Sequence, residues 1–215
     1  MSSTWLYLIR HGEVEHAAEG RFFGHTDVAL SATGLLQVDA LACRLAIEPI
    51  DAVYASDLRR AQQSAGPLAA ARGLAPVTVP ALREMAMGRW EGLTFREIGE
   101  REPEAQHDWL ANLTTFPFPG GENVEHLRAR VLPALREILA RHAGGRVAVV
   151  AHGGTNRVIL SDALGMPLGH LLRLAQDYAC WSVVEYRRDM AILHTLNQRV
   201  AGIAAAEPVE RTVVG

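Results

Sequence analysis

Cysteine is scarce in this sequence, and its placement argues against two kinds of protein. The chain has 215 residues and two cysteines, Cys43 and Cys180. Their spacing matches no metal-binding or redox motif, and two distant residues make no disulfide framework. A disulfide-stabilised secreted module is therefore not indicated. We interpret both cysteines as small side chains of the core, in a protein of a reducing compartment.

Long apolar runs and a strong net charge are absent as well. The apolar run at residues 5–9 (WLYLI) is far shorter than the ~18 residues of a membrane span, and no basic residue precedes it as in a signal peptide. A net charge of −3 disfavours sequence-independent nucleic-acid binding, which rests on many cations that contact phosphates. We therefore expect a cytoplasmic protein that binds neither membranes nor nucleic acid.

The length and composition suit one globular domain. Hydrophobic residues make up 49% of the chain and charged residues 21%, so a core can form without disulfides or metals. We expect a single domain over residues 1–203 and a C-terminal tail over 204–215. Glycines and prolines interrupt short amphipathic stretches at about residues 85–121, and we interpret that region as an insertion over one end of a sheet.

Hydrophobic patterning predicts alternating strands and helices. Runs rich in branched and aromatic residues predict extended segments, which are 4–10, 51–55, 76–80, 145–151, 181–187 and 190–196. Helical spacing of apolar residues predicts helices, which are 30–46, 58–72, 122–142 and 155–164. This alternation predicts an α/β fold, with a largely parallel sheet covered by helices on both faces.

Chemically active side chains follow the predicted strands directly. Arg10 and His11 end the first strand, His152 follows the strand at 145–151, and Arg60 lies one turn into the helix after the second strand. Ligands of such sheets bind outside the carboxyl ends of the strands. Gly12 and Gly153 come next to the histidines, and we expect them to let the backbone approach a ligand and present its amides.

Two arginines and two histidines at one crevice indicate a phosphate site. Arginine forks match tetrahedral oxyanions, whereas nearby cations would repel a divalent metal. An imidazole can also attack phosphorus and form a covalent phosphohistidine. Departure of the alcohol needs a proton, for which Glu84 is the best candidate.

Each of these residues alone also has a simpler interpretation. A single histidine is more often a surface or core residue, and Arg10 or Glu84 could be ordinary surface groups. The other histidines keep that interpretation; they are His16, His25, His107, His126, His142, His170 and His194. The joint pattern favours chemistry.

Five motifs, in order along the chain, resemble the histidine phosphatase superfamily, also called the phosphoglycerate-mutase-like family. They are LIRHGE (8–13), GHTDVALSATGLLQ (24–37), SDLRRAQQSA (56–65), LREMAMGRWEG (82–92) and VVAHGG (149–154). The resemblance extends over about residues 4–200. It implies a three-layer α/β sandwich with a mixed sheet, no metal or cofactor, and a small-molecule phosphomonoester as substrate.

The resemblance also implies a role for each residue of the site. His11 is the nucleophile, Arg10, Arg60 and His152 bind the phosphoryl group, and Glu84 is the proton donor. Many members carry an asparagine that contacts phosphate where this chain has Ala17. His16, or the backbone around Phe23 and Gly24, is expected to replace that contact, so the expected substrate-binding residues are Arg10, Gly12, Phe23, Gly24, Arg60, His152 and Gly153.

The region after Glu84 bears on the substrate. Glycolytic mutases of the family carry a longer insertion with extra basic residues, whereas here acidic residues outnumber Arg89, Arg96 and Arg101. This balance favours hydrolysis of a monoester with a larger, less charged leaving group. Cys180-Trp181-Ser182 and the stretch 196–199 (LNQR) look most like alpha-ribazole-5'-phosphate phosphatases of cobalamin assembly, with a broad-specificity phosphatase as the other interpretation.

Two alternatives stay open at this point. One is a phosphoglycerate mutase, which would transfer the phosphoryl group rather than release it. The other is a non-catalytic phosphate-binding module, and the only residue that favours it is Ala17. The oligomeric state is open too, a homodimer included.

Overall fold

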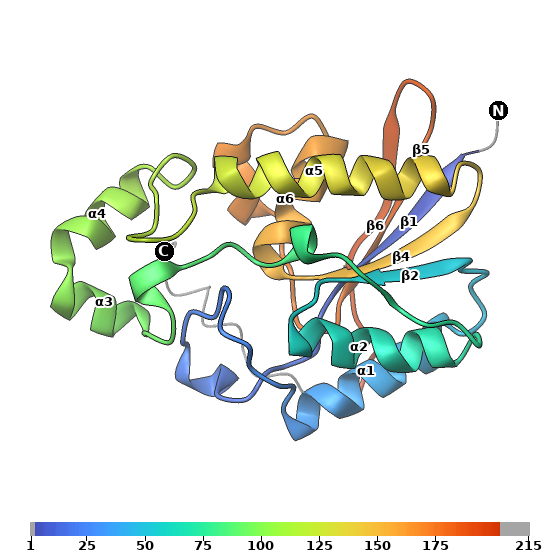
Figure 1. Cartoon of the computed structure of the whole chain (residues 1–215), viewed down its shortest axis with the longest axis horizontal. Coiled ribbons are helices and arrows are strands. Elements are labelled where there is room, and N and C mark those ends of the chain that lie inside the picture. The colour runs from blue at the N-terminus through green and yellow to red at the C-terminus, as the bar shows by residue number, and fades with distance from the viewer. Residues whose placement is uncertain (1–2, 203–215) are drawn as a thin grey trace.

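A six-stranded sheet forms the centre of the protein (Figure 1), seen in a computed structural model that describes residues 3–202. The strands lie in the order β3-β2-β4-β1-β5-β6. Their bounds are β1 Thr4–Arg10, β2 Ala52–Ala55, β3 Val77–Thr78, β4 Arg146–Ala151, β5 Trp181–Tyr186 and β6 Ala191–Gln198. β1, β2, β3 and β4 pair in parallel, whereas β5 is antiparallel to both β1 and β6. The sheet is thus mixed and mostly parallel, as the resemblance implies.

Helices cover both faces of this sheet (Figure 1), which completes the three layers. α1 (Ala32–Leu45) and α2 (Arg59–Ala70) pack on one face, and α5 (Val124–Arg141) and α6 (Gly153–Ala163) on the other. Ser31 begins α1 by accepting a hydrogen bond from the Gly34 amide, the usual role of serine at a helix N-terminus. Short 3₁₀ helices connect the longer elements; they are η1 Ala17–Glu19, η2 Pro80–Leu82, η3 Gly88–Trp90 and η4 Leu168–Arg173.

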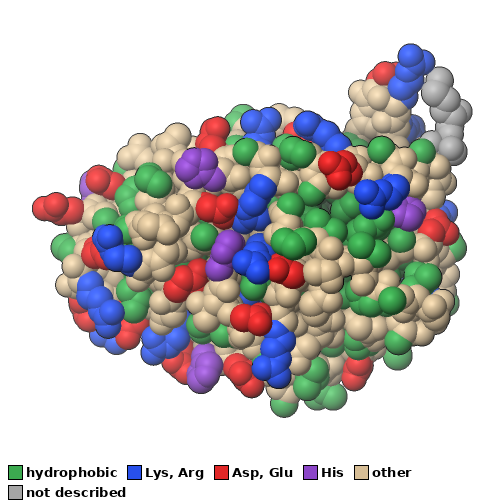
Figure 2. Space-filling model, in the orientation of Figure 1, with side chains coloured by type: hydrophobic (Ala, Val, Ile, Leu, Met, Phe, Trp, Pro, Cys, Tyr) green, Lys and Arg blue, Asp and Glu red, His purple; other side chains and the backbone are tan. Residues whose placement is uncertain are grey.

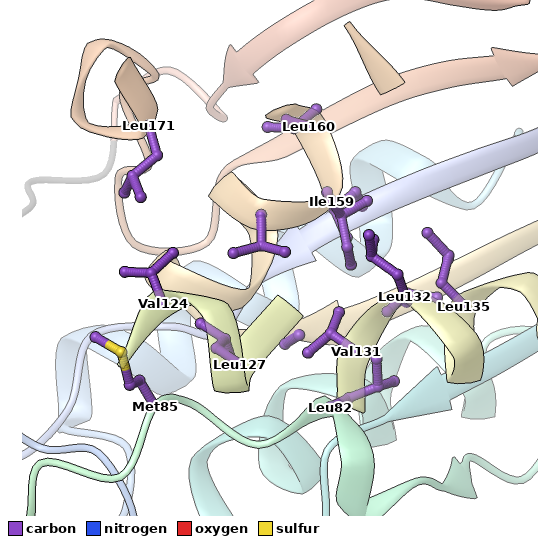
Figure 3. Close-up of a cluster of buried hydrophobic side chains, with 14 of the residues drawn as sticks. Leu82, Met85, Val124, Leu127, Val131, Leu132, Leu135, Ile159, Leu160 and Leu171 are labelled. Atoms are coloured by element: carbon purple, nitrogen blue, oxygen red, sulfur yellow. The ribbon is translucent and has the colours of Figure 1, made fainter. Parts of the chain in front are cut away.

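The larger apolar core lies between the sheet and the α5–α6 layer. Figure 3 shows side chains from α5, α6, η4 and the segment after η2 turned toward one another. The labelled members are Leu82, Met85, Val124, Leu127, Val131, Leu132, Leu135, Ile159, Leu160 and Leu171. Leu82 and Met85 are both buried in this cluster. The chain is therefore anchored on both sides of Glu84.

The predicted insertion contains two short helices, α3 (Phe95–Arg101) and α4 (Pro103–Ala111), beyond the carboxyl ends of β1 and β4 (Figure 1). Trp90 is completely buried, and its ring lies 5.7 Å from Trp109 and 5.2 Å from Phe118, measured between centroids. Phe22, from the loop after β1, meets Trp109 edge-on at 5.7 Å. The insertion thus has an aromatic core that it shares with the loop after β1.

The structure corrects one of the cysteine predictions. Cys180 is buried, but Cys43 lies on the exposed side of α1, so only one of them is a core residue. The tail predicted over 204–215 lies outside the described residues. Among residues 3–202, no helix is both long and apolar enough to cross a membrane.

Candidate active site

The two histidines of the predicted site follow two neighbouring strands. Arg10 and Ala151 are paired in the parallel register of β1 and β4, so His11 and His152 leave the sheet side by side. Their ring centroids are 5.1 Å apart. His11 is 5% exposed and His152 is fully buried. The sequence pattern predicts this meeting because the carboxyl ends of parallel strands share one edge.

His11 is held as a neutral imidazole with a defined proton position. Its Nδ1 lies 2.7 Å from the carbonyl oxygen of Gly12, and since a carbonyl only accepts, Nδ1 carries the proton. Burial, followed by the guanidiniums of Arg60 and Arg10, holds the pKa of His11 well below its usual 6.5. At neutral pH the ring therefore offers the Nε2 lone pair as a nucleophile.

His152 has the opposite tautomer. The Nε of Arg60 donates to its Nδ1 at 3.2 Å, which leaves the proton of the neutral ring on Nε2. Burial and the charge of Arg60 hold the pKa of His152 well below 6.5. Within the described part of the chain, its buried Nε2 has no hydrogen-bond partner. A buried donor without a protein partner is what a ligand-binding group requires.

Arg60 is almost fully buried and joins the loop after β1 to the site. Its terminal nitrogens donate to the carbonyls of Thr26, Gly24 and Phe23, at 2.8, 2.7 and 3.3 Å. Most of its N–H groups are thus used inside the protein. Arg60 brings positive charge to the histidines, fixes the tautomer of His152 and holds the carbonyls of Phe23 and Gly24, whose backbone was expected to contact the substrate.

Arg10 lies at the tip of β1 and is held from one side by the segment before β5. Its guanidinium donates to the carbonyl of Gln176, and its Cζ atom lies 4.2 Å from the ring centroid of Tyr178. A cation over an aromatic face is electrostatically favourable. Tyr178 was missed by the sequence analysis.

Glu84 is buried beside the N-terminal end of α6. One carboxylate oxygen accepts the amide of Met85 and the other accepts the amide of Gly154, both at 2.8 Å. These two hydrogen bonds fix the position of the carboxyl group relative to α6. An added Cβ at Gly154 would press against one carboxylate oxygen of Glu84, so a larger residue there would force the carboxylate to move. Glu84 is therefore bound to Gly154, which follows His152 by two positions in the chain.

The residues that hold Glu84 in place were not predicted. Arg130 in α5 makes a two-point ion pair with Glu122 and donates to the carbonyls of Ala81, Arg83 and Glu84. We call Arg130 and Glu122 the Arg130–Glu122 clamp. His25, for which a surface or core role was the simpler expectation, lies with Nε2 3.0 Å from the carbonyl oxygen of Glu84.

Glu91 organises the loop at residues 24–26. Its carboxylate accepts the amides of Gly24, His25 and Thr26, and also the hydroxyl of Thr26. These bonds hold the pKa of Glu91 below its usual value against the effect of burial. The motif MGRWEG contains this residue, but its partners lie more than 60 positions away, so no local spacing indicates them.

Three groups that were expected to contact phosphate have partners within the protein. The amide of Gly12 donates to Ser64 Oγ at 3.0 Å, and a Cβ there would lie 2.7 Å from the Gly34 carbonyl, so close packing on α1 explains this glycine. His16 is exposed and pairs with Glu19 at 2.7 Å instead of turning to the site. The amide of Gly24 is engaged by Glu91, as described above.

Charged groups also surround the site at the surface. Figure 2 shows basic, acidic and histidine side chains gathered near the middle of one face, where the beginning of α2 meets the segment after η2. At these elements Arg83 binds Asp57 with two hydrogen bonds, of 2.7 and 2.6 Å. Arg83 holds the pKa of Asp57 below its usual value. Within residues 3–202, no group of three or more histidine, cysteine or acidic side chains could hold a metal ion.

This chain is similar in sequence to several known proteins. A bifunctional protein of Mycobacterium tuberculosis is 38% identical over 189 residues, which are 87% of this chain and 52% of that protein. The chain thus spans about half the length of this relative. A metal-independent phosphoserine phosphatase of Arabidopsis thaliana is 40% identical over 160 residues, 73% of this chain and 67% of its own length.

A solved structure has the same architecture. It is a putative alpha-ribazole-5'-P phosphatase from Escherichia coli, with a TM-score of 0.85 and 29% identity, and the match covers 94% of this chain and 99% of the other. The sequence model of the histidine phosphatase superfamily (branch 1) matches residues 6–199. This range includes every residue of the site described above. The chain belongs to the histidine phosphatase superfamily.

Proposed function

We propose that this chain hydrolyses phosphomonoesters through a covalent phosphohistidine at His11. The observation that carries the proposal is the neutral His11 ring, whose Nδ1–H is bound by the Gly12 carbonyl so that Nε2 keeps its lone pair. This nitrogen lies beside His152 and in the positive field of Arg10 and Arg60. A nucleophile and several cationic or donor groups at one point suit transfer of an anionic phosphoryl group.

The first half of the reaction transfers the phosphoryl group. Nε2 of His11 attacks phosphorus, the bond to the ester oxygen breaks, and protonated Glu84 gives its proton to the departing oxygen. The Nε2–H of His152 and the guanidinium of Arg10 stabilise the phosphoryl oxygens, while Arg60 adds charge and keeps His152 in the required tautomer.

The second half releases phosphate. Glu84, now a carboxylate, takes a proton from water as that water attacks phosphorus. The bond between phosphorus and Nε2 breaks, inorganic phosphate leaves, and neutral His11 and protonated Glu84 are restored. Hydrolysis thus needs no group beyond the residues of the site and water.

Regarding the substrate, we propose a monoester whose leaving group is larger and less charged than phosphoglycerate. Two of the three cations in the insertion are engaged, Arg89 with Glu102 at 3.3 Å and Arg96 with Glu100 at 2.7 Å. A second phosphate or a carboxylate would need such cations unpaired. Alpha-ribazole-5'-phosphate is our first candidate because of the similar solved structure, and a broad range of monoesters is the second.

We further propose that residues 1–203 act as one catalytic domain and that the insertion at 85–121 covers the active site. The aromatic contacts of Phe22 with Trp109 link this insertion to the loop that Arg60 and Glu91 hold. The leaving-group pocket is then formed between the insertion and that loop.

Phosphate release from a panel of monoesters tests the function. The panel contains alpha-ribazole-5'-phosphate, phosphoserine, sugar phosphates and phosphoglycerates. We expect release that EDTA leaves unchanged and vanadate inhibits, with His11→Ala reducing it by at least ~10³-fold. Loss with EDTA that zinc restores would contradict the mechanism. Transfer between positions of phosphoglycerate with little free phosphate would instead support a mutase.

Labelling separates catalysis from mere binding. We expect a phosphorylated substrate to label the protein with acid-labile, base-stable phosphate that His11→Ala abolishes. Phosphate binding without any such label would support a non-catalytic phosphate-binding module.

A further inference from the structure

Tyr178 lies among the charged groups of the candidate site, although no step described so far uses it. Its ring is 4.2 Å from Cζ of Arg10, and its centroid is 5.6 Å from that of His11. Tyr178 is only half-buried, so part of it stays open to a bound molecule. One side chain thus adjoins two residues of the phosphoryl site, Arg10 and His11.

The backbone around Tyr178 is fixed to β1 from two directions. The amide of Ala179 donates to the carbonyl of His11, and the amide of Arg10 donates to the carbonyl of Cys180, both at 3.0 Å. These bonds tie the segment to the same strand tip that carries the nucleophile. A side chain on this segment therefore keeps a constant position relative to His11, as a binding group must.

A second set of contacts holds the same segment from β6. Asn197 accepts the amide of Asp177 at 2.7 Å and donates to its carboxylate at 3.0 Å, and Arg199 pairs with that carboxylate at 3.3 Å. Ala179 has a φ of 51°, a left-handed conformation that is strained for alanine. Strain of this kind persists where the surroundings enforce it, which is common at functional sites.

In the loop after β1, position 17 carries alanine and therefore provides no polar side chain. Ala17 packs against the small apolar cluster of Val14, Leu30 and Val38, and Tyr178 packs against the same cluster. His16, the neighbouring polar residue, is exposed and bound to Glu19. The phenol of Tyr178 is therefore a polar group that borders the cluster on which Ala17 packs.

We propose that the Tyr178 hydroxyl donates a hydrogen bond to a phosphoryl oxygen of the substrate, at the side of the site that Ala17 leaves without a polar contact. This inference rests on the proposed phosphatase function and adds a residue to it. The ring packs against the guanidinium of Arg10, and the hydroxyl would supply a neutral donor to the phosphoryl group. A donor at the phosphoryl group strengthens binding as charge on the oxygens grows.

Tyr178→Phe tests the hydroxyl because it keeps the ring on Arg10. We expect kcat/KM to fall about tenfold or more, the usual effect of losing a hydrogen bond to a charged group, with inhibition by vanadate weakened to a similar degree. In the Tyr178→Phe background, Ala17→Asn should restore part of both. The matched control is Tyr186→Phe, which removes a buried hydroxyl that has no partner among the described residues, at the other end of β5.

The outcomes are separable from those of the phosphatase test. Tyr178→Phe with kcat/KM and vanadate inhibition equal to wild type, in a wild-type enzyme that hydrolyses monoesters, overturns the inference and leaves the proposed function intact. An equal loss in Tyr186→Phe also overturns it, because the effect would then be structural. If the wild type forms no phosphohistidine at all, the result contradicts the proposed function itself, and the inference about Tyr178 falls with it.

Discussion

The position of the Glu84 carboxylate depends on the absence of a side chain at Gly154. The Gly154 amide binds one oxygen of the Glu84 carboxylate, and an added Cβ would press against the other. Gly154→Ala should therefore displace the carboxylate while α6 stays intact, because alanine favours helix more than glycine does. We expect kcat to fall at least about tenfold, with a smaller change in KM, for a monoester whose leaving group needs a proton. Steady-state kinetics provides the measurement.

Gly169→Ala is the matched control for that prediction. A Cβ at Gly169 meets nothing within 4 Å, so kcat and KM should stay at the wild-type values. A monoester with a very acidic alcohol as leaving group adds a second check. It departs without a proton, so Gly154→Ala should slow its first step less. Equal losses for both types of ester would contradict the role of Glu84 as proton donor.

At the residue scale, the strand-tip residues were predictable and their supports were not. Arg10, His11 and His152 were found because the register of parallel strands fixes where a strand-end residue lies. Glu91 and Tyr178 contact their partners only after distant segments have packed. No periodicity encodes such contacts, and a carboxylate or tyrosine looks the same in the sequence whether or not it lines a site. Gly12 was expected to present its amide to a ligand, whereas in the structure this amide binds Ser64 and the residue packs closely on α1.

At the scale of elements, the Arg130–Glu122 clamp joins α5 to the segment that carries Glu84. Arg130→Ala removes the guanidinium from which three backbone carbonyls and the Glu122 carboxylate accept hydrogen bonds. We expect the free energy of unfolding to fall by about 2 kcal/mol, less than for a fully buried pair because both side chains are about a fifth exposed. Urea denaturation measures this change, and kcat should fall because Glu84 loses its support.

Arg96→Ala serves as the comparison within the same chain. Arg96 pairs with Glu100 on an exposed turn of α3, so we expect its removal to change the free energy of unfolding by less than about 0.5 kcal/mol. Arg130→Lys keeps the charge but cannot fork, and it should resemble Arg130→Ala more than wild type. Equal stability of Arg130→Ala and Arg96→Ala would show that the clamp is not structural.

Most helices and strands lie where the hydrophobic pattern of the sequence predicts them, whereas the two helices of the insertion were not predicted. Helices α1, α2, α5 and α6 begin and end within a few residues of the predicted bounds, because their apolar spacing extends over several turns. α3 and α4 have seven and nine residues, too few for a clear period, and they pack on an aromatic cluster built from four separate segments. Their place beyond the sheet follows from that packing.

At the scale of the whole molecule, two buried neutral histidines make stability depend on pH. His11 and His152 have pKa values well below 6.5 in the folded protein, whereas both return to about 6.5 on unfolding. Below pH 6.5 the unfolded chain therefore binds protons that the folded chain does not, so acid favours unfolding. Each histidine should lower the free energy of unfolding by up to about 1.4 kcal/mol per pH unit until its folded pKa is reached.

Urea denaturation between pH 7.5 and 5.5 checks this expectation. The carboxylates with lowered pKa values, such as Glu91, titrate in the unfolded chain only near pH 4, so they contribute little in this window. His152→Gln should flatten the dependence by about the contribution of one histidine. An unfolding free energy that is the same at both ends of the window would mean that the two rings are protonated in the folded protein.

The position of β1 in the middle of the sheet has a consequence for biosynthesis. Within this chain β1 comes first, whereas its neighbours in the sheet, β4 and β5, begin only at residues 146 and 181. At typical translation rates of ~5–20 residues per second, the run WLYLI stays without its sheet partners for on the order of ten seconds. We expect the nascent chain to need protection of this segment by a chaperone, and the nucleophile to reach its place only after β4 and β5 have been synthesised.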